Sequence, residues 1–387
     1  MFSTNSLQAL KKAWEIRKYP TAGRNAHPAR IALNALPYYA SWTGWALPPL
    51  SVFIHVNTAC NLRCKMCDAG QEAVESTFYK NLKGNHPGDM PLESFKAIVN
   101  KVASFKPFIG IPVLEPLLYP HIEAAVAHVH ERGMPISLAT NATMLEDRAD
   151  ALVTAGLDRI VVSLDGTREI HDRIRGVAGV YDKVLLGLRV LAESKRRHGS
   201  RTPYVFINYV ISEDNQGVIR DFADGLPLDL VDQVDFRVMF YCTQQLADAH
   251  NERFGEELLA TEACLAGGID LAKVDTDLVH AQMDDVLARH AKCKFFFNHG
   301  REGLRTYYHD GATFLDSTNC VWPWYTMQVS NDATVIPFQR CFNDDYGNIL
   351  TQDFQAIWNG PRLRRMRKLL RTHGRFPACA RCEGVNF

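Results

Sequence analysis

The sequence predicts an α/β protein in which a parallel sheet curves into an open barrel, followed by a small cysteine-rich domain. Between residues 51 and 243, short apolar runs alternate with amphipathic stretches, as in strands buried on both faces of a parallel sheet. Six such units suggest a partial (β/α)6 TIM-like barrel, whose chemistry would lie at the carboxyl ends of the strands. Most of the ten cysteines fall into two groups with metal-like spacing, one beside the first strand and one near the end of the 387-residue chain.

Apolar periodicity and turn residues locate the individual elements. A short amphipathic helix is expected over Ser6–Arg17 and a polar surface loop over residues 70–88. The predicted strands are 51–57, 108–114, 135–140, 159–164, 203–211 and 234–240. The predicted helices between them are 91–105, 120–132, 145–155, 180–197 and 216–224.

Four regions follow from this pattern. Residues 244–310 have no strand pattern and read as a helical insert, with helices over 256–263 and 271–291. The predicted organisation is an N-terminal cap (1–50), the barrel (51–243), the insert (244–310) and a cysteine-rich domain (311–387).

Composition excludes some classes of protein. The chain has 43 basic and 43 acidic residues, and this balance argues against a nonspecific nucleic-acid binder. No secretory signal is visible, so we expect a cytoplasmic protein whose grouped cysteines bind metal.

A stretch without charged side chains runs from Ile31 to Ile54, long enough on paper to span a membrane. Pro37, Pro48 and Pro49 interrupt it, so we expect a cap packed over one end of the barrel. The alternative is that residues 31–50 associate with a membrane surface. The aromatic residues for such an anchor would be Tyr38, Tyr39, Trp42 and Trp45.

The cysteine loop follows the first predicted strand and reads Cys60-Asn61-Leu62-Arg63-Cys64-Lys65-Met66-Cys67. Three thiolates at this spacing can hold a 4Fe–4S cube and leave one iron without a protein ligand. An odd number of cysteines without a secretory signal disfavours disulfides. A zinc site would normally require a fourth ligand.

The C-x3-C-x2-C spacing resembles the cluster loop of the radical S-adenosylmethionine (SAM) enzymes. The resemblance implies that Cys60, Cys64 and Cys67 bind the cluster and that the amine and carboxylate of SAM chelate the fourth iron. One electron would then cleave the sulfonium, giving a 5′-deoxyadenosyl radical that abstracts hydrogen from a substrate. The same likeness implies the (β/α)6 architecture.

Residues after the later strands extend this resemblance. Val113-Leu114-Glu115-Pro116 is similar to the family's Gly-Gly-Glu-Pro segment, with Glu115 toward the methionyl amine but without either glycine. Thr140-Asn141-Ala142 is close to the family's Thr-Asn-Gly turn. The implied SAM contacts further along are Ser163 and Asp165 near the ribose, Arg175 (or Arg173) near the carboxylate, and Asn208 and Asn215 as weaker polar contacts.

Four cysteines mark the C-terminal domain: Cys320, Cys341, Cys379 and Cys382. Their order resembles the SPASM/twitch auxiliary-cluster domain, which implies a second 4Fe–4S cluster, although Cys341 comes later than the family's second cysteine usually does. A zinc ribbon is the alternative, but a second C-x2-C pair is missing. Cys242, Cys264 and Cys293 are expected to be buried small hydrophobes.

A basic helix after Pro361 carries Arg362, Arg364, Arg365, Arg367, Lys368 and Arg371. We expect a solvated face, with a contact to a phosphorylated substrate or an acidic electron donor as the alternative.

The sequence therefore predicts a radical SAM enzyme that oxidises or epimerises a small molecule, such as a sugar or cyclitol, with a flavodoxin- or ferredoxin-type electron donor. A peptide or protein maturase is the second hypothesis, disfavoured because about fifty residues before the first strand leave little room for a leader-binding domain. A noncatalytic metal-binding scaffold is the third.

Overall fold

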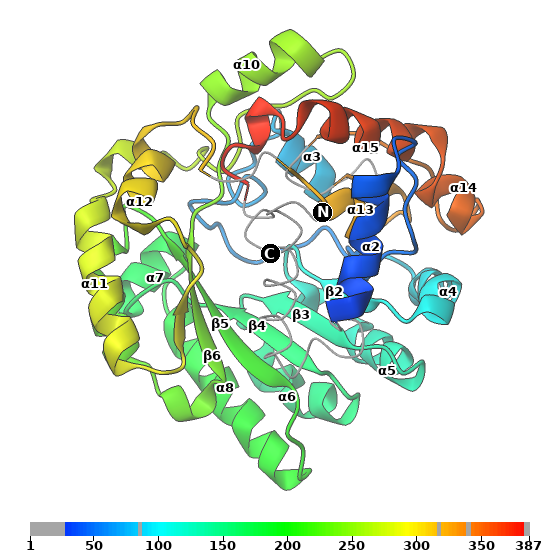
Figure 1. Cartoon of the computed structure of the whole chain (residues 1–387). Helices are drawn as coiled ribbons and strands as arrows, with labels where there is room; N and C mark the ends of the chain where they lie inside the picture. The colour runs from blue at the N-terminus through cyan, green and yellow to red at the C-terminus, as the bar shows by residue number, and fades with distance from the viewer. Residues whose placement is uncertain (1–27, 84–86, 316–318, 338–341, 383–387) are drawn as a thin grey trace.

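One curved sheet organises the protein. The computed structural model describes residues 28–83, 87–315, 319–337 and 342–382. The strand order is β7-β6-β5-β4-β3-β2-β1-β8-β9, parallel throughout except for the last pair. Strands β7 and β9 form the two edges of this sheet, so the barrel is open, as predicted. Figure 1 shows strands β2 to β6 within the sheet. The strands are β1 (Ser51–Ile54), β2 (Phe108–Ile111), β3 (Ile136–Thr140), β4 (Arg159–Ser163), β5 (Tyr204–Ile211), β6 (Gln233–Val238), β7 (Cys293–Phe295), β8 (Thr326–Val329) and β9 (Val335–Ile336).

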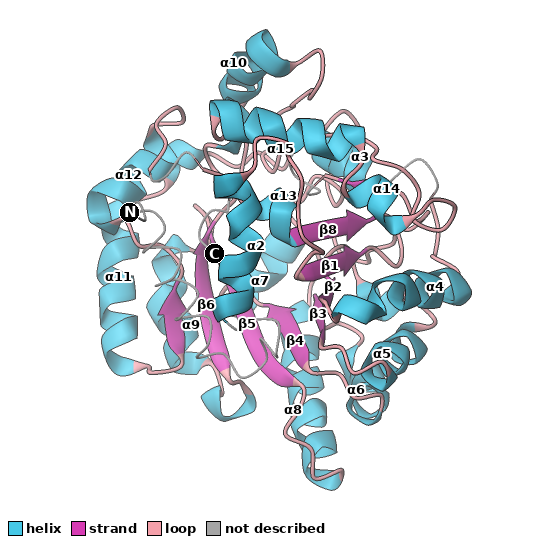
Figure 2. Cartoon of the chain, turned by 45° about the vertical axis from the view of Figure 1, so that its right-hand side comes forward, coloured by secondary structure: helices cyan, strands magenta, loops and turns pink. Residues whose placement is uncertain are grey.

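Helices cover the outer face of the sheet (Figure 2). A representative helix, α4, buries one stripe made of Phe95, Ile98, Val99 and Val102. The α-helices are α2 (Pro28–Ala40), α3 (Thr77–Lys83), α4 (Leu92–Val102), α5 (Ile122–Glu131), α6 (Leu145–Thr154), α7 (Arg168–Arg175), α8 (Val180–Arg197), α9 (Ile219–Gly225), α10 (Gln244–Phe254), α11 (Thr276–Arg289), α12 (Gly300–His309), α13 (Trp322–Tyr325), α14 (Phe354–Trp358) and α15 (Pro361–His373).

The insert differs from its prediction. The prediction of a helix over 256–263 is wrong. The helix in this part of the insert is α10, which ends at Phe254, and the chain after it is irregular. Side chains of α10 hold that irregular segment: His250 Nε2 bonds to the Leu258 carbonyl and Asn251 bonds to both backbone groups of Ala260. Strand β7 was also missed, since three residues are too few to show a periodicity.

Two other predictions concern the N-terminal half. The loop predicted over residues 70–88 contains α3, which buries Phe78 and Leu82 within a largely polar stretch. The helix predicted over Ser6–Arg17 lies outside the described residues.

The cysteine-rich C-terminal stretch contributes to the barrel sheet. Strand β8 pairs in parallel with β1, from Ser51 opposite Thr326 to Ile54 opposite Val329. This pairing covers the edge of β1 that would otherwise present unpaired backbone groups. Strands β8 and β9 of the C-terminal stretch therefore extend the barrel sheet.

Helix α2 lies at the start of strands β1 and β8. The Tyr38 ring meets Trp324 of α13 edge-on with centroids 5.0 Å apart, and Asn34 donates to the Pro48 carbonyl at 2.9 Å. These contacts pack α2 against α13 and against the chain that leads into β1. Within the described ranges, no helix has the length and apolar character needed to cross a membrane.

His55, just after β1, should make stability depend on pH. Its Nε2 lies 2.5 Å from Nε2 of Gln328, and burial lowers its pKa to about 3 although Asp332 opposes this. Below about pH 6.5, His55 is protonated in the unfolded chain but stays neutral in the folded protein. The free energy of unfolding therefore falls as pH falls from about 6.5 toward 3. Urea unfolding of the iron-free chain should show that the contribution of His55 to the free energy of unfolding is about 1.4 kcal/mol smaller at pH 5.5 than at pH 7.5. His55→Gln should remove that part of the slope, and an unchanged slope would contradict the assignment.

Candidate active site

The cysteine loop leaves β1 at the carboxyl edge of the sheet. Cys64 is buried, Cys67 half-buried and Cys60 exposed, and the Cys67 N–H donates to the Cys64 carbonyl at 3.1 Å. Although Cys60 is exposed to solvent as a residue, the protein around its sulfur removes part of its hydration. This desolvation raises the pKa of the Cys60 thiol to about 11, and the neighbouring Cys64, Glu115 and Cys67 contribute. The three thiols are therefore close enough to influence one another electrostatically.

This donor set fits an iron–sulfur cube. Among the described residues, no three His, Cys, Asp or Glu side chains converge as the ligands of a single ion would. A 4Fe–4S cube binds each thiolate through a different iron, so its ligands need not converge on one point. Three thiols on one short loop thus suit a cluster better than a lone zinc ion.

The end of α7 holds this loop through its backbone. The Arg63 N–H donates to the Arg175 carbonyl at 3.1 Å, and the Lys65 N–H donates to the Ile174 carbonyl at 2.9 Å. The last carbonyls of a helix lack partners within the helix, so the loop satisfies them. Gly176 ends α7 with φ +74°, and a Cβ there would lie 2.8 Å from the Arg63 carbonyl oxygen.

Glu115 is fully buried at the end of the β2 segment, so it is not a solvated loop acid. Its Oε1 accepts from the Leu117 N–H at 2.9 Å and the Thr140 hydroxyl at 2.6 Å, and its Oε2 accepts from the Asn141 N–H at 2.7 Å. Burial raises its pKa to about 7 in spite of these hydrogen bonds. The carboxylate thus ties the ends of two neighbouring strands together.

Two residues adopt glycine-like conformations although they are not glycines. Leu114 has φ +57° and Ala142 has φ +58°, at the positions where the resemblance expects glycine. The left-handed conformation costs a residue with a Cβ about 1–2 kcal/mol. At these two positions, the backbone keeps its left-handed turn without glycine.

Three predicted polar contacts lie along the same edge. Asn141 Nδ2 is 4.0 Å from Cys60 Sγ and donates to Asn61 Oδ1 at 2.8 Å. Ser163 and Asn208 are register partners on β4 and β5, and neither side chain hydrogen-bonds to another described residue. Both hydroxyl and amide are therefore available to a ligand.

Arg175 lies beside the cysteine loop. Its Nη1 donates to Cys64 Sγ at 3.5 Å, and its Nη2 pairs with Asp165 inside the protein. Burial alone would lower the pKa of Arg175, but Asp165 and Cys64 raise it above its usual range. Arg173, the competing candidate, is exposed and donates to the Asp214 carbonyl at 3.3 Å.

Asn215 does not offer a cofactor contact. Its Nδ2 donates to the carbonyls of Asp165 and Val210, and its Oδ1 accepts from the Ser212 N–H at 2.8 Å. The amide is fully buried and serves to fix the turn after β5.

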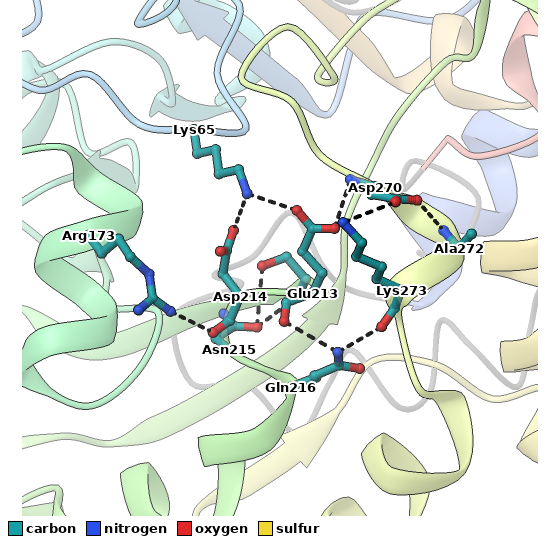
Figure 3. Close-up of polar contacts among 10 residues, drawn as sticks. Lys65, Arg173, Glu213, Asp214, Asn215, Gln216, Asp270, Ala272 and Lys273 are labelled. Atoms are coloured by element: carbon teal, nitrogen blue, oxygen red, sulfur yellow. Dashed lines mark hydrogen bonds and ion pairs between the residues drawn. The ribbon is translucent and has the colours of Figure 1, made fainter.

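Sequence reasoning missed an ionic contact on Lys65 (Figure 3). Lys65 Nζ lies 2.8 Å from Glu213 Oε1 and 2.8 Å from Asp214 Oδ2, which follow β5. Glu213 Oε2 also accepts from the Asp270 N–H of the insert at 2.8 Å. A lysine inside the cysteine motif and two adjacent acids after a strand were the available signal.

The insert packs directly against the cysteine loop. The Cys264 N–H donates to Asp68 Oδ1 at 2.8 Å, just after the last cysteine of the loop. A Cβ on Gly267 would lie 2.2 Å from the Lys65 carbonyl oxygen. The segment that appeared least informative in sequence therefore helps to position the loop.

Three of the four C-terminal cysteines share one apolar cavity. Burial raises the pKa of Cys320 to about 12, Cys382 adds to this and Arg375 opposes it, while Cys379 is raised by burial and by both other thiols. Cys341 lies outside the described residues. The cavity is lined by these three cysteines together with Trp322, Pro323, Met327, Gln328, Phe342, Tyr346, Trp358 and Arg375, among others.

The prediction for the remaining cysteines is confirmed, whereas the prediction for the basic helix fails at one residue. Cys242, Cys264 and Cys293 are buried, as expected. The prediction of a solvated basic face on α15 is wrong for Arg367, which is fully buried. Its guanidinium donates to the carbonyls of Pro323, Gly44 and Trp358. It anchors α15 to the rest of the fold.

Gly267→Ala should disturb the cysteine loop, because the added methyl collides with a backbone carbonyl that cannot rotate away. We expect urea unfolding of the iron-free chain to show that the free energy of unfolding falls by about 1–3 kcal/mol. Iron–sulfur absorbance after reconstitution should fall as well. Gly217→Ala is the matched control, since nothing lies within 4 Å of its Cβ position, and equal effects of both variants would contradict the contact.

Comparisons with known proteins agree with this geometry. Residues 54–219 match the model of the radical SAM superfamily, and residues 320–383 match the SPASM iron–sulfur cluster-binding domain. Fe-coproporphyrin III synthase of Methanosarcina barkeri is 29% identical over 188 residues, which are 47% of this chain and 42% of that protein. Pre-heme d1 synthase of Dinoroseobacter shibae is 27% identical over 171 residues, 44% of this chain and 38% of that protein. The matches therefore span about two fifths of these relatives.

A solved structure has a similar fold over most of this chain. SuiB of Streptococcus suis, bound to S-adenosylmethionine, has a TM-score of 0.59 and 16% identity, covering 94% of this chain and 77% of that chain. At this identity the likeness concerns the fold alone. Motif order and family models agree that the chain contains a radical SAM domain over residues 54–219 and a SPASM iron–sulfur domain over residues 320–383, with the SAM, 4Fe–4S and auxiliary iron–sulfur cofactors that these domains imply.

Proposed function

We propose that the protein cleaves SAM reductively and uses the resulting 5′-deoxyadenosyl radical to oxidise a small organic molecule. The observation that carries this proposal is the meeting of three cysteines, a buried carboxylate and a buried guanidinium at one edge of the sheet. That edge is where parallel α/β barrels place their chemistry.

Cys60, Cys64 and Cys67 would hold the first cluster, and Cys320, Cys341, Cys379 and Cys382 the auxiliary one. When bound, the clusters and SAM supply the electron transfer and hydrogen abstraction that protein side chains cannot provide. The raised pKa of Cys60 and Cys320 in the iron-free chain means that these thiols would lose their protons only on metal binding.

The other residues of the edge have separate roles. Glu115 Oε2 accepts one hydrogen bond and has capacity for another, so it could accept from the methionyl ammonium. Ser163 and Asn208 would contact hydroxyl groups of the ribose. Asp165, whose carboxylate is occupied by Arg175 and the Val210 N–H, would act by orienting Arg175 and not by touching the ribose.

Oxidation follows from the pairing of a radical site with a second cluster. The substrate would lose one hydrogen atom to the 5′-deoxyadenosyl radical, which would become 5′-deoxyadenosine. Loss of one further electron to the auxiliary cluster and of one proton would then leave a product oxidised by two electrons. Relatives named for porphyrin and heme chemistry favour a small molecule over a peptide. We keep a sugar or cyclitol as the predicted substrate class, with a flavodoxin- or ferredoxin-type donor in the cytoplasm and net epimerisation as the other small-molecule outcome.

Cys64→Ala should abolish formation of 5′-deoxyadenosine, because a cube with two thiolate holders is not retained. Cys293→Ala removes a similarly buried sulfur far along the chain and should leave the activity intact. Liquid chromatography of reduced, anaerobic reactions measures both. Adding sugars, porphyrins or peptides to the same reaction identifies the substrate class by the increase in release; an increase with a peptide alone would favour the maturase.

Cys379→Ala should lower the iron content from roughly eight atoms per chain to about four while SAM cleavage without substrate persists. Iron analysis and absorbance spectra after anaerobic reconstitution measure this. A protein that binds zinc and never cleaves SAM would be the noncatalytic scaffold, and the proposed function would then be wrong.

A further inference from the structure

We propose that a surface on α2 and the loop after it docks on a membrane that contains anionic lipids. This surface, the aromatic patch, consists of Leu33, Leu36, Tyr39, Trp42 and Trp45. Their exposed fractions are 53%, 48%, 38%, 71% and 43%. The large apolar side chains exposed elsewhere on the described chain are scattered over other elements, whereas these five lie close together in sequence. Exposed apolar side chains gathered in one short segment are typical of an interaction site.

Helix α2 is apolar on both of its faces. Its inner face packs on α13 and on the chain before β1 through Tyr38 and Asn34. Its outer face carries Leu33, Leu36 and Tyr39, spaced by three residues so that they follow one side of the helix. A helix at a water-exposed surface normally presents polar residues there, but the charged residues of α2 are limited to Arg30 in its first turn, which donates to the Phe105 carbonyl.

A stripe of cations on α15 borders the aromatic patch. Arg364, Lys368 and Arg371 are spaced by four and three residues and so lie on one side of α15. The Arg371 guanidinium lies 4.2 Å from the ring centroid of Trp42, and Arg364 donates to the Thr43 carbonyl at 2.8 Å. Both views of the fold show α15 beside α2 (Figures 1 and 2). The sequence has no Asp or Glu from residue 16 to residue 67, so the patch's own segment contributes no opposing charge.

A lipid surface matches this chemistry. Trp and Tyr prefer the boundary between headgroups and acyl chains, and adjacent Lys and Arg are attracted to anionic headgroups. In a symmetric dimer through the patch, the cationic stripes of both copies would lie close together and repel each other. The charge pattern therefore favours an anionic membrane over a second copy of the chain.

The position of the patch is compatible with catalysis. Helix α2 lies at the start of β1, where Asn34 reaches Pro48, whereas the cysteine loop follows the other end of that strand. A membrane on the aromatic patch would leave the carboxyl edge of the sheet accessible to substrate and electron donor.

Flotation of the full-length, anaerobically reconstituted protein tests this proposal. Vesicles of phosphatidylcholine alone are compared with vesicles of equal parts phosphatidylcholine and phosphatidylglycerol. The wild type should float with the anionic vesicles, and Trp42→Ser/Trp45→Ser should lower the bound fraction roughly tenfold. Lys368→Glu should weaken binding to the anionic vesicles only, and added salt should act in the same direction.

Leu278→Ser/Leu287→Ser is the matched control, because it removes two apolar side chains that are each 40% exposed on α11. It should bind vesicles like the wild type, and SAM cleavage should be unchanged in every variant. The proposal is overturned if the wild type binds neither vesicle, or if the control loses binding as the patch variant does. It is also overturned if light scattering without lipid shows that the patch variant dissociates a dimer, or if that variant only impairs reduction by an acidic flavodoxin.

Discussion

The fold of the site depends on one interaction, the capture of the cysteine loop by the last turn of α7. An irregular loop has no hydrogen-bond ladder of its own, and a helix end has carbonyls without partners. Two hydrogen bonds satisfy both partners: the Arg63 N–H donates to the Arg175 carbonyl, and the Lys65 N–H donates to the Ile174 carbonyl. Because α7 is fixed on the barrel, the loop inherits its position from a rigid element. A different loop conformation would leave buried backbone groups unpaired on both partners.

Charge is arranged around the loop in layers of different exposure. Asp165 and Arg175 form a buried pair, in which breaking one partner would leave an uncompensated charge. The Arg175 guanidinium donates to Cys64 Sγ, so this pair places a positive charge beside the cysteine loop. Further out, Lys65 pairs with Glu213 and Asp214 in a more exposed contact. Like Arg175, it joins the loop to another strand end.

The C-terminal stretch completes the sheet and brings the second group of thiols onto the same body. Pairing of β8 with β1 fixes the chain just after Cys320, while Cys379 and Cys382 return from the end of α15. Buried Arg367 ties α15 to the loop that precedes β1, so the N-terminal and C-terminal segments pack together at one end of the barrel. Both the auxiliary cysteines and the aromatic patch depend on this packing.

The sequence by itself determined the alternation of buried strands and amphipathic helices, because burial on both faces leaves continuous apolar runs. It also determined the cysteine groups, whose spacing is local, and the order of Glu115, Asn141, Ser163 and Arg175 along the strand ends. Tertiary structure alone decided which of two arginines reaches Cys64, since Arg173 and Arg175 differ only in the side of α7 on which they lie. It also decided the contact of Gly267 with the cysteine loop, the hydrogen bond from the Asp270 N–H to Glu213, and the pairing of β8 with β1. These contacts join residues more than fifty positions apart, and no local pattern records them because each depends on where the intervening chain folds back.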